Sequence, residues 1–221
     1  MNLSSEKKII AILLLVIVAI TSTAFIFYNQ LKKLNDTSKW VTHTNEVLFQ
    51  SQLVLSTALD NETGARGYIV TGDKKFLEPL ENSEKTIYAV ITKLKKLTED
   101  NSKQQQHVSE LDRLINNRIQ FSNKTVAARE EIGFDTAMAL VASGVGKVLM
   151  DSIRSIIFKM QVEENALLEI RKSANEREAA TLVNIIIINA VLIFVLILII
   201  IIMVLKEIRM LKKNIETLST A

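Results

Sequence analysis

Two long uncharged apolar stretches limit what this chain can fold into. No residue is charged from Ile9 to Leu31, and none is charged from Thr181 to Leu205. Each stretch exceeds the ~20 residues that a helix needs to cross about 30 Å of hydrocarbon. Both could instead be buried core helices, but a soluble domain of this size would not cover two of them. We therefore predict transmembrane helices at 9–31 and 181–205, with a domain between them at 32–180.

The first stretch has an alternative interpretation as a cleaved signal peptide. Lys7 and Lys8 precede the apolar run, and small residues follow within it at 22–24, as in a secretory signal. The apolar run nevertheless continues from Phe25 to Tyr28. This continuation favours an uncleaved membrane anchor.

The distribution of charge predicts the orientation of the two spans. The ends of the chain carry six basic and three acidic residues, whereas the segment 32–178 holds 21 of each sign. The net charge of +3 therefore lies entirely at the two ends. Because basic flanks tend to remain cytoplasmic, we expect a cytoplasmic N-terminus at 1–8, a cytoplasmic segment at 206–221 and an exported domain.

The composition argues against several classes of protein. The chain has no cysteine, so disulfides and thiolate chemistry are excluded, and His43 and His107 are too far apart in sequence to suggest a metal site. The net charge is too small and the signs too mixed for a nucleic-acid binder. Six glycines and one proline are too few for a sheet-rich fold. With no catalytic constellation in the sequence, we expect no enzymatic activity, no cofactor and no metal.

The segment between the spans has the pattern of four helices. Asn101 or Ser102 can cap a helix after a polar break at 98–102, and a second helix begins between Asp73 and Pro79. Four groups of apolar residues recur at helical spacing: Val41, Leu48, Leu55 and Leu59; Phe76, Leu80, Ile87, Ile91, Leu94 and Leu97; Val108, Leu111, Ile115 and Ile119; and Leu149, Ile153, Ile156, Met160, Leu167, Ile170 and Ala174. In the last group Glu163 is the only polar residue in the frame.

These elements predict an all-α, membrane-anchored, up-down-up-down four-helix bundle that is continuous with the two transmembrane helices. Connectivity then places two clusters of glycines together at the end of the bundle far from the membrane. We expect these glycines to interrupt the helices and to permit positive φ: Gly64, Gly67, Gly72, Gly144 and Gly146.

The residues of this apex resemble a known sensory module. The run DNETGARGYIVTGD at 60–73, followed by FLEP at 76–79, is similar to the signature of the third class of CHASE domains (cyclase/histidine-kinase-associated sensory extracellular domains). The segments around Trp40 and at 144–154 and 163–171 support the resemblance. The similarity extends from about Lys39 to Ala174.

The resemblance implies a periplasmic sensory domain of an inner-membrane bacterial receptor, with no particular ligand. The outputs of such receptors include histidine kinases, cyclases and chemoreceptors, and a sensor histidine kinase is the output that we expect here. Family members usually continue into a cytoplasmic output domain, so we expect one beyond Ala221. The alternatives are a chemoreceptor or cyclase-type receptor, or a stand-alone membrane scaffold that binds a partner protein.

Charged residues near the apex are candidates for a sensing network. Glu62 and Arg66 continue the apolar frame of the first helix and are spaced to form an i,i+4 ion pair, which would be costly to break if buried. The pair can either respond to a ligand or fix the register of the helices, and the register role is better attested. The candidate set is Glu62, Arg66, Tyr68, Thr71, Asp73, Lys147, Asp151 and Arg154, with the last three as the expected partners of the pair.

Two features near the second span predict a parallel homodimer. Asn184 and Asn189 lie within the apolar stretch, where polar side chains tend to face another helix. Beyond the membrane, a short coiled-coil seam has the 3-4-3 spacing of a dimer contact: Ile208, Leu211, Ile215 and Leu218. The alternative is an amphipathic helix that lies on lipid. The expected partners are thus the membrane, a second copy and an unknown periplasmic ligand, without nucleic acid.

Overall fold

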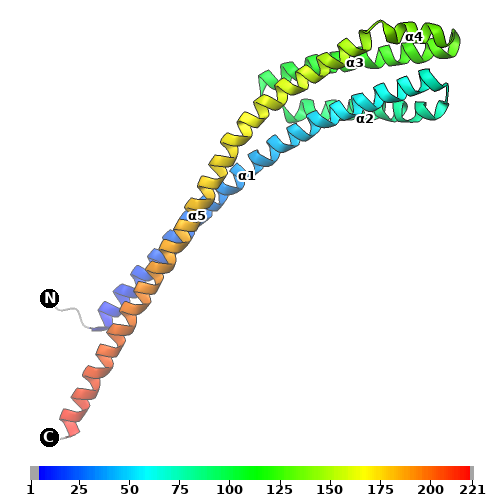
Figure 1. The fold of residues 1–221 in the computed structure, drawn as a ribbon. Helices are drawn as coiled ribbons and strands as arrows, with labels where there is room; N and C mark the ends of the chain where they lie inside the picture. Colours follow the sequence, from blue (N-terminus) through cyan, green and yellow to red (C-terminus); the bar gives the residue numbers. More distant parts are fainter. Residues whose placement is uncertain (1–4, 220–221) are drawn as a thin grey trace. The chain divides into compact units, whose positions relative to one another are not determined.

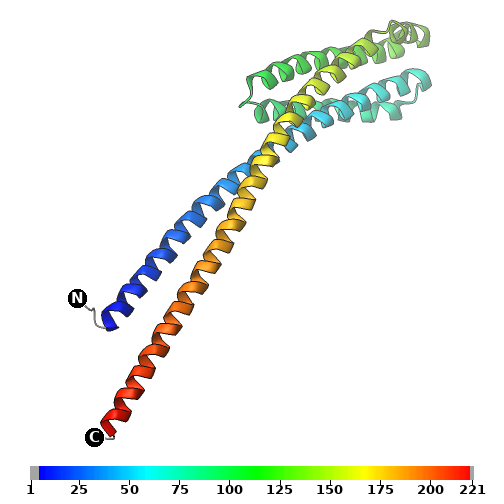
Figure 2. The same cartoon turned by 60° about the vertical axis from the view of Figure 1, so that its left-hand side comes forward.

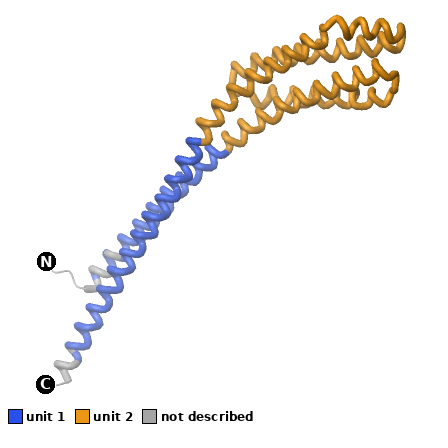
Figure 3. The backbone as a smooth tube through the Cα atoms, in the orientation of Figure 1, with its two compact units in different colours: residues 1–38, 173–221 blue, residues 39–172 orange. Residues whose placement is uncertain are grey.

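The computed structural model describes residues 5–219, and every regular element among them is helical. In chain order these are α1 (Ser5–Thr71), the 3₁₀ turn η1 (Lys74–Phe76), α2 (Leu77–Leu97), α3 (Ser102–Glu131), α4 (Phe134–Ala142) and α5 (Val145–Ser219) (Figure 1). The chain divides into two units (Figure 3). Unit 1 combines Met1–Ser38 with Ser173–Ala221, and unit 2 is Lys39–Lys172. Helices α1 and α5 contribute to both units.

Unit 2 is the predicted four-helix bundle. Its core draws on α1, α2, α3 and α5, with fully buried members such as Val54, Leu94, Ile115 and Ile153. Neighbouring helices run antiparallel, as the order of their contacts shows. Between α1 and α5, Gln52 is hydrogen-bonded to Gln161 and the earlier Thr44 to the later Arg171. Between α2 and α3, Tyr88 is hydrogen-bonded to Asn116 and the later Lys95 to the earlier Asp112. Burial of this apolar surface is the main force that holds the four helices together.

The turns of the bundle carry elements that the apolar pattern did not predict. Helix α4 stands between α3 and α5 and buries Ala137 against Ile69 and Ala128. Gly133 and Gly144 flank it with positive φ angles of 126° and 77°, which is why the helix breaks on both sides. The turn between α2 and α3 agrees with the prediction. Asn101 caps α3 by accepting hydrogen bonds from two backbone N–H groups at 3.1 and 3.2 Å.

The buried face of α1 is shifted by one residue from the predicted frame. Leu48, Leu55 and Leu59 are only half-buried, whereas the buried positions are Val47, Ser51, Val54, Ala58, Asn61, Ala65 and Ile69. The spacing of four and three is the same in both frames. The structure selects the smaller side chains because α1 packs closely on its neighbours, and large leucines fit only at the edges of that contact.

A second difference occurs in α5 after Met160. Ile170, predicted to be in the core, is 68% exposed, and Glu164 and Leu168 are buried instead, at 3% and 7%. Glu163, the polar residue expected in the frame, is half-buried and receives hydrogen bonds from Lys103 and His107. The start of α2 agrees with the prediction, because the helix begins at Leu77, between Asp73 and Pro79. Asp73 caps η1, and Pro79 lies in the first turn of α2.

Within the described residues, unit 1 contains two helical segments that are long and apolar enough to cross a membrane. The most apolar windows of α1 and α5 have mean hydropathies of 1.8 and 3.7, and only 6% and 0% of these windows are buried within the protein. A core helix would be covered by its own chain, so this exposure argues against the core-helix alternative. Gln30 Nε2 donates to the Glu178 carboxylate, and Thr37 Oγ1 donates to Asn175 Oδ1 at 2.9 Å, so α1 and α5 are in contact there. Figure 2 shows the two helices separating from each other toward the ends of the chain.

Candidate sensory site

Both glycine clusters lie at the same end of unit 2, as connectivity predicted. Helix α1 ends at Thr71 because Gly72 adopts a φ of +72°, a conformation that favours glycine. The guanidinium of Arg129, on α3, closes this end by donating from Nε to the Ile69 carbonyl at 2.9 Å. The same guanidinium lies 5.4 Å from the ring of Phe134 on α4.

Three of the five predicted helix-breaking glycines lie inside helices instead. Gly64 and Gly67 belong to α1 and Gly146 to α5, and none of them has a positive φ. Their role is close approach. A Cβ on Gly64 would lie 2.9 Å from the backbone oxygen of Phe76, one on Gly67 would lie 2.3 Å from the Phe76 ring, and one on Gly146 would lie 3.0 Å from the ring of Phe121.

Glu62 and Arg66 form the predicted ion pair, at 2.8 Å. The pair is asymmetric, because the Glu62 side chain is 11% exposed and that of Arg66 is 55% exposed. The one-residue shift of the α1 frame turns Arg66 toward solvent. The expectation that both charges lie in the interior is therefore wrong for Arg66.

The buried cation at this level is Arg118 of α3, which the sequence reasoning did not select. It is 4% exposed, and its Nη1 donates to Ser122 Oγ at 2.5 Å. Ser122 Oγ in turn donates to Asn61 Oδ1 of α1 at 2.6 Å. Arg118 Nε and Asn61 Nδ2 are buried without a hydrogen-bond partner. Burial lowers the pKa of Arg118. The negative charge of Glu62 partly offsets this lowering, and the positive charge of Arg66 adds to it.

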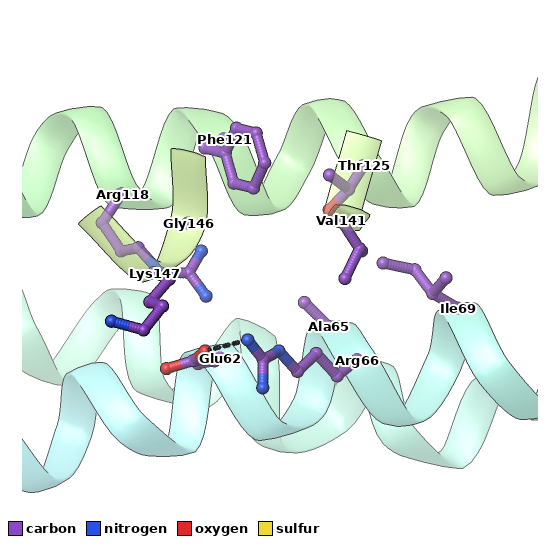
Figure 4. A pocket seen from close by; sticks show the side chains of 10 residues that line it. All are labelled: Glu62, Ala65, Arg66, Ile69, Arg118, Phe121, Thr125, Val141, Gly146 and Lys147. Atoms are coloured by element: carbon purple, nitrogen blue, oxygen red, sulfur yellow. Dashed lines mark ion pairs between the residues drawn. The ribbon is translucent and has the colours of Figure 1, made fainter. Parts of the chain in front are cut away.

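A small cavity of about 30 Å³ opens beside this polar layer (Figure 4). Its lining includes the cations Arg66, Arg118 and Lys147 and the carboxylate of Glu62; the remaining lining residues are Ala65, Ile69, Phe121, Thr125, Val141 and Gly146. Helices α1, α3, α4 and α5 all contribute. A cavity of this volume holds about two water-sized groups, so it is too small for a drug-sized ligand.

The expected partners on α5 do not join the Glu62–Arg66 pair. Asp151 accepts bonds from Lys147 and Arg154, and these three exposed residues form a separate cluster along one face of α5. Both neighbours lower the pKa of Asp151, the Lys147 hydrogen bond most strongly. Lys147 alone lines the cavity.

The remaining residues of the predicted network have local roles. Tyr68 is buried and donates to Glu130 Oε1 at 3.2 Å, and its pKa is raised by burial and by this carboxylate. Thr71 Oγ1 accepts from the backbone of Asp73 at 3.1 Å, and Asp73 caps η1. These contacts shape the turn after α1 and stay apart from the cavity.

A second buried polar cluster, at the end of unit 2 where α1 enters and α5 leaves, was also missed. Glu164 is buried there beside Gln104, and burial raises its pKa despite the opposing charges of Arg171 and His43. The guanidinium of Arg171 donates to Thr44 Oγ1. It also lies 4.7 Å from the ring of Trp40, and His43 Nε2 is 2.8 Å from the Leu97 carbonyl oxygen.

The sequence contained a signal for both missed residues. Arg118 and Ser122 continue the spacing of four and three that begins at Leu111 and Ile115, and Glu164 continues that of Ile157 and Met160. A polar residue that takes a position in an apolar frame indicates a buried polar contact. The frames chosen from large apolar residues passed over these positions.

The features predicted near the membrane are only partly described. In unit 1, Asn189 lines a groove between α1 and α5 with Thr23 and Phe27, whereas Asn184 is exposed. Ile208, Leu211 and Ile215 are exposed on α5 at 45–64%. The side chain of Leu218 lies outside the described residues, as do residues 1–4 of the predicted cytoplasmic N-terminus.

Comparison with known proteins identifies the family. The model of the CHASE3 domain matches residues 37–174, which is more than half of the 221 residues. The chain belongs to the CHASE3 domain family. The matched range coincides closely with unit 2, so the resemblance inferred from the apex signature is confirmed. Unit 2 is therefore the sensory domain of a signal-transduction receptor.

A solved structure supports the fold of the CHASE3 domain. The chain is similar to the sensor domain of the histidine kinase HK9 from Rhodopseudomonas palustris, with 22% sequence identity and a TM-score of 0.53. The match covers 56% of this chain and 97% of that sensor domain. A search among curated proteins gave no match.

Proposed function

We propose that this chain is the sensory and membrane-anchoring part of a bacterial sensor histidine kinase. Unit 2 would detect a signal outside the cytoplasm, and α5 would transmit it across the membrane to a kinase domain beyond Ala221. The chain itself would act by binding and transmission rather than by catalysis.

One observation carries this proposal. Helix α5 supplies Gly146 and Lys147 to the cavity of the CHASE3 domain and also contains the apolar window that could cross a membrane. No glycine or proline follows Gly146 in the sequence, so nothing in its composition breaks the helix between these two regions. A displacement at the apex can therefore pass along one helix.

Orientation and assembly are part of the proposal. The charge distribution supports cytoplasmic termini and a periplasmic domain in the inner membrane. The exposed residues Ile208, Leu211 and Ile215 support a parallel homodimer that pairs through the end of α5.

Alkaline phosphatase fused after Asp100 should be active, and the same enzyme fused after Ala221 should be inactive. Cysteines at 208, 211 and 215 should cross-link between copies more readily than cysteines at 210 and 213.

A cross-link between α1 and α5 tests the transmission step. Gln52 and Gln161 are joined by a hydrogen bond of 3.1 Å, and the chain has no native cysteine. The variant Gln52→Cys/Gln161→Cys, with residues 1–221 fused to the kinase domain of a histidine kinase, can be linked with a short bis-maleimide. Linking should change the autophosphorylation rate several-fold by restricting the movement of α5 along α1.

The control is the single variant Gln52→Cys treated with the same reagent, which should keep the rate of the untreated protein. If the doubly substituted protein is fully linked and its rate is unchanged, relative movement of α1 and α5 is not the signal. Transmission as proposed here would then be refuted.

A further inference from the structure

The cavity at the apex of unit 2 has more positive than negative charge in its lining. Arg66, Arg118 and Lys147 contribute three cations, and Glu62 contributes the only carboxylate among the described lining residues. Figure 4 shows Glu62, Arg66 and Arg118 facing one another from α1 and α3, whereas the Lys147 side chain of α5 extends away from them. Among these three cations Arg118 is the buried one, at 4% exposure, because the side chains of Arg66 and Lys147 are 55% and 74% exposed at the edge of the cavity.

The cations are not equally compensated. Arg66 pairs with Glu62 at 2.8 Å, and Lys147 pairs with Asp151. Arg118 has no carboxylate within ion-pair distance among the described residues, although it is 4% exposed. Within the part of the chain that the structure describes, its guanidinium donates one hydrogen bond, to the neutral Ser122 hydroxyl, and its Nε is unpartnered. A buried charge without a counter-charge is costly, and an anion beside Arg118 would relieve this cost.

The backbone adds to this preference. Gly146 and Lys147 line the cavity and belong to the first turn of α5, where backbone N–H groups lack intrahelical partners and the helix end is partially positive. Gly146 has no side chain, so the backbone of α5 lies directly at the cavity. Helix N-termini bind anions when a second feature directs the anion there, and Arg118 is that feature.

The size of the cavity restricts the anion. A volume of about 30 Å³ accommodates about two water-sized groups, which is comparable to the three heavy atoms of a carboxylate. Tetrahedral sulfate and phosphate have five heavy atoms and are larger in every direction. The apolar walls formed by Ala65, Ile69 and Val141 would contact the hydrocarbon side of a short acid.

We propose that this cavity binds the carboxylate group of a small organic acid, held by Arg118 with Arg66 and Lys147 at its sides. The proposal rests on the proposed function in one respect, that occupancy of the cavity is the signal. Since Arg66 lies on α1 and Lys147 at the start of α5, a bound carboxylate draws these two helices together at the apex. A small organic acid is thus the class of ligand that we infer for the sensory domain.

The test measures stabilisation by simple salts. The full chain in lipid nanodiscs is unfolded by heat while the fluorescence of Trp40, the single tryptophan, reports on unit 2. Sodium formate and sodium acetate are compared with sodium sulfate at matched ionic strength. A dissociation constant near 10 mM would raise the midpoint by about 4 °C at 50 mM formate, and the rise should continue with the logarithm of the formate concentration.

Two variants and one control decide the site. Arg118→Gln should abolish the formate response, whereas Arg113→Gln should retain it, because Arg113 lies on the same helix with a side chain that is 64% exposed. Ala65→Val keeps all three cations but fills the space, and it should weaken the response at least five-fold in formate concentration. Circular dichroism establishes that each variant is folded.

Equal midpoints in all salts would overturn the proposal, and so would a formate response that persists in Arg118→Gln. This assay contains no kinase domain, so formate can stabilise the chain even if the cross-link leaves the kinase rate unchanged. The cross-link can likewise change the kinase rate even if formate has no effect. The two proposals are therefore tested separately.

Discussion

Replacing Arg118 with methionine is expected to stabilise the sensory domain, although it removes a fully buried contact. Methionine keeps the length of the side chain and is a good helix former. The variant also leaves the Glu62–Arg66 pair intact. If Arg118 were a structural register device, the same substitution would destabilise the bundle.

The expected magnitude follows from the surroundings of the guanidinium. Desolvation of a buried ion costs several kcal/mol; here it is offset by one bond of 2.5 Å to Ser122, by a distant attraction to Glu62 and by the ring of Phe121 at 6.0 Å. Replacement of buried charges by apolar groups of similar size is often stabilising by about 1–4 kcal/mol. Because Ser122 loses a donor, we expect a gain of about 1–3 kcal/mol in the free energy of unfolding.

The assay is urea unfolding of the full chain in nanodiscs, followed by Trp40 fluorescence in sulfate buffer, whose anion does not fit the cavity. Arg113→Met is the matched control on α3, and it should change stability by less than about 0.5 kcal/mol, as exposed substitutions do. A loss of more than 1 kcal/mol for Arg118→Met would refute the view that this cation is uncompensated.

Three further predictions concern other parts of unit 2. Gly64→Ala should lower the free energy of unfolding by about 1–2 kcal/mol in a denaturant experiment, because the clash of the new Cβ with backbone atoms outweighs the helix propensity of alanine. Gly67→Ala should lower it by less than half as much, because its Cβ meets the movable, half-exposed ring of Phe76. Arg66→Ala should cost under about 1 kcal/mol in the same assay, as exposed pairs do, and a loss of 3 kcal/mol would place Arg66 back in the interior. Because the pKa of Glu164 is raised above 4.5, the folded state holds this proton more tightly, and its stabilising contribution is lost as pH rises through the folded pKa. The melting temperature of Glu164→Gln relative to wild type should therefore increase from pH 4 to pH 7, and a constant difference would contradict the raised pKa.

The one-residue shift on α1 is a feature that the apolar pattern of the sequence could not predict. The spacing of four and three identified the helix and its period, and it did not decide between Leu48–Leu55 and Val47–Val54 as the buried edge. Both edges are apolar, so transfer free energy barely separates them. The choice depends on how closely the neighbouring helices approach, and that approach is permitted by Gly64 and Gly67 against the turn that begins α2.

The same limit explains the two missed polar residues. Arg118 and Glu164 stand at frame positions in the sequence, yet a polar residue there can be buried, can turn to solvent or can mark a change of frame. Only the assembled bundle shows that Asn61 lies within reach of Ser122, the partner of Arg118, and that Gln104 lies within reach of Glu164. Buried polar contacts join residues far apart in the chain, and such pairs leave no periodic pattern.

The amino-acid sequence was sufficient to predict the helical class, the two apolar segments, the antiparallel order of the four long helices and the family signature at the apex. These features depend on local properties, namely hydrophobic period, helix capping and the absence of turn residues, which each segment carries alone. Tertiary packing sets which face of α1 is buried, makes Arg118 rather than Arg66 the interior cation, and leaves a small cavity lined by α1, α3, α4 and α5. Those features depend on the distances between helices, which arise only when all four pack together.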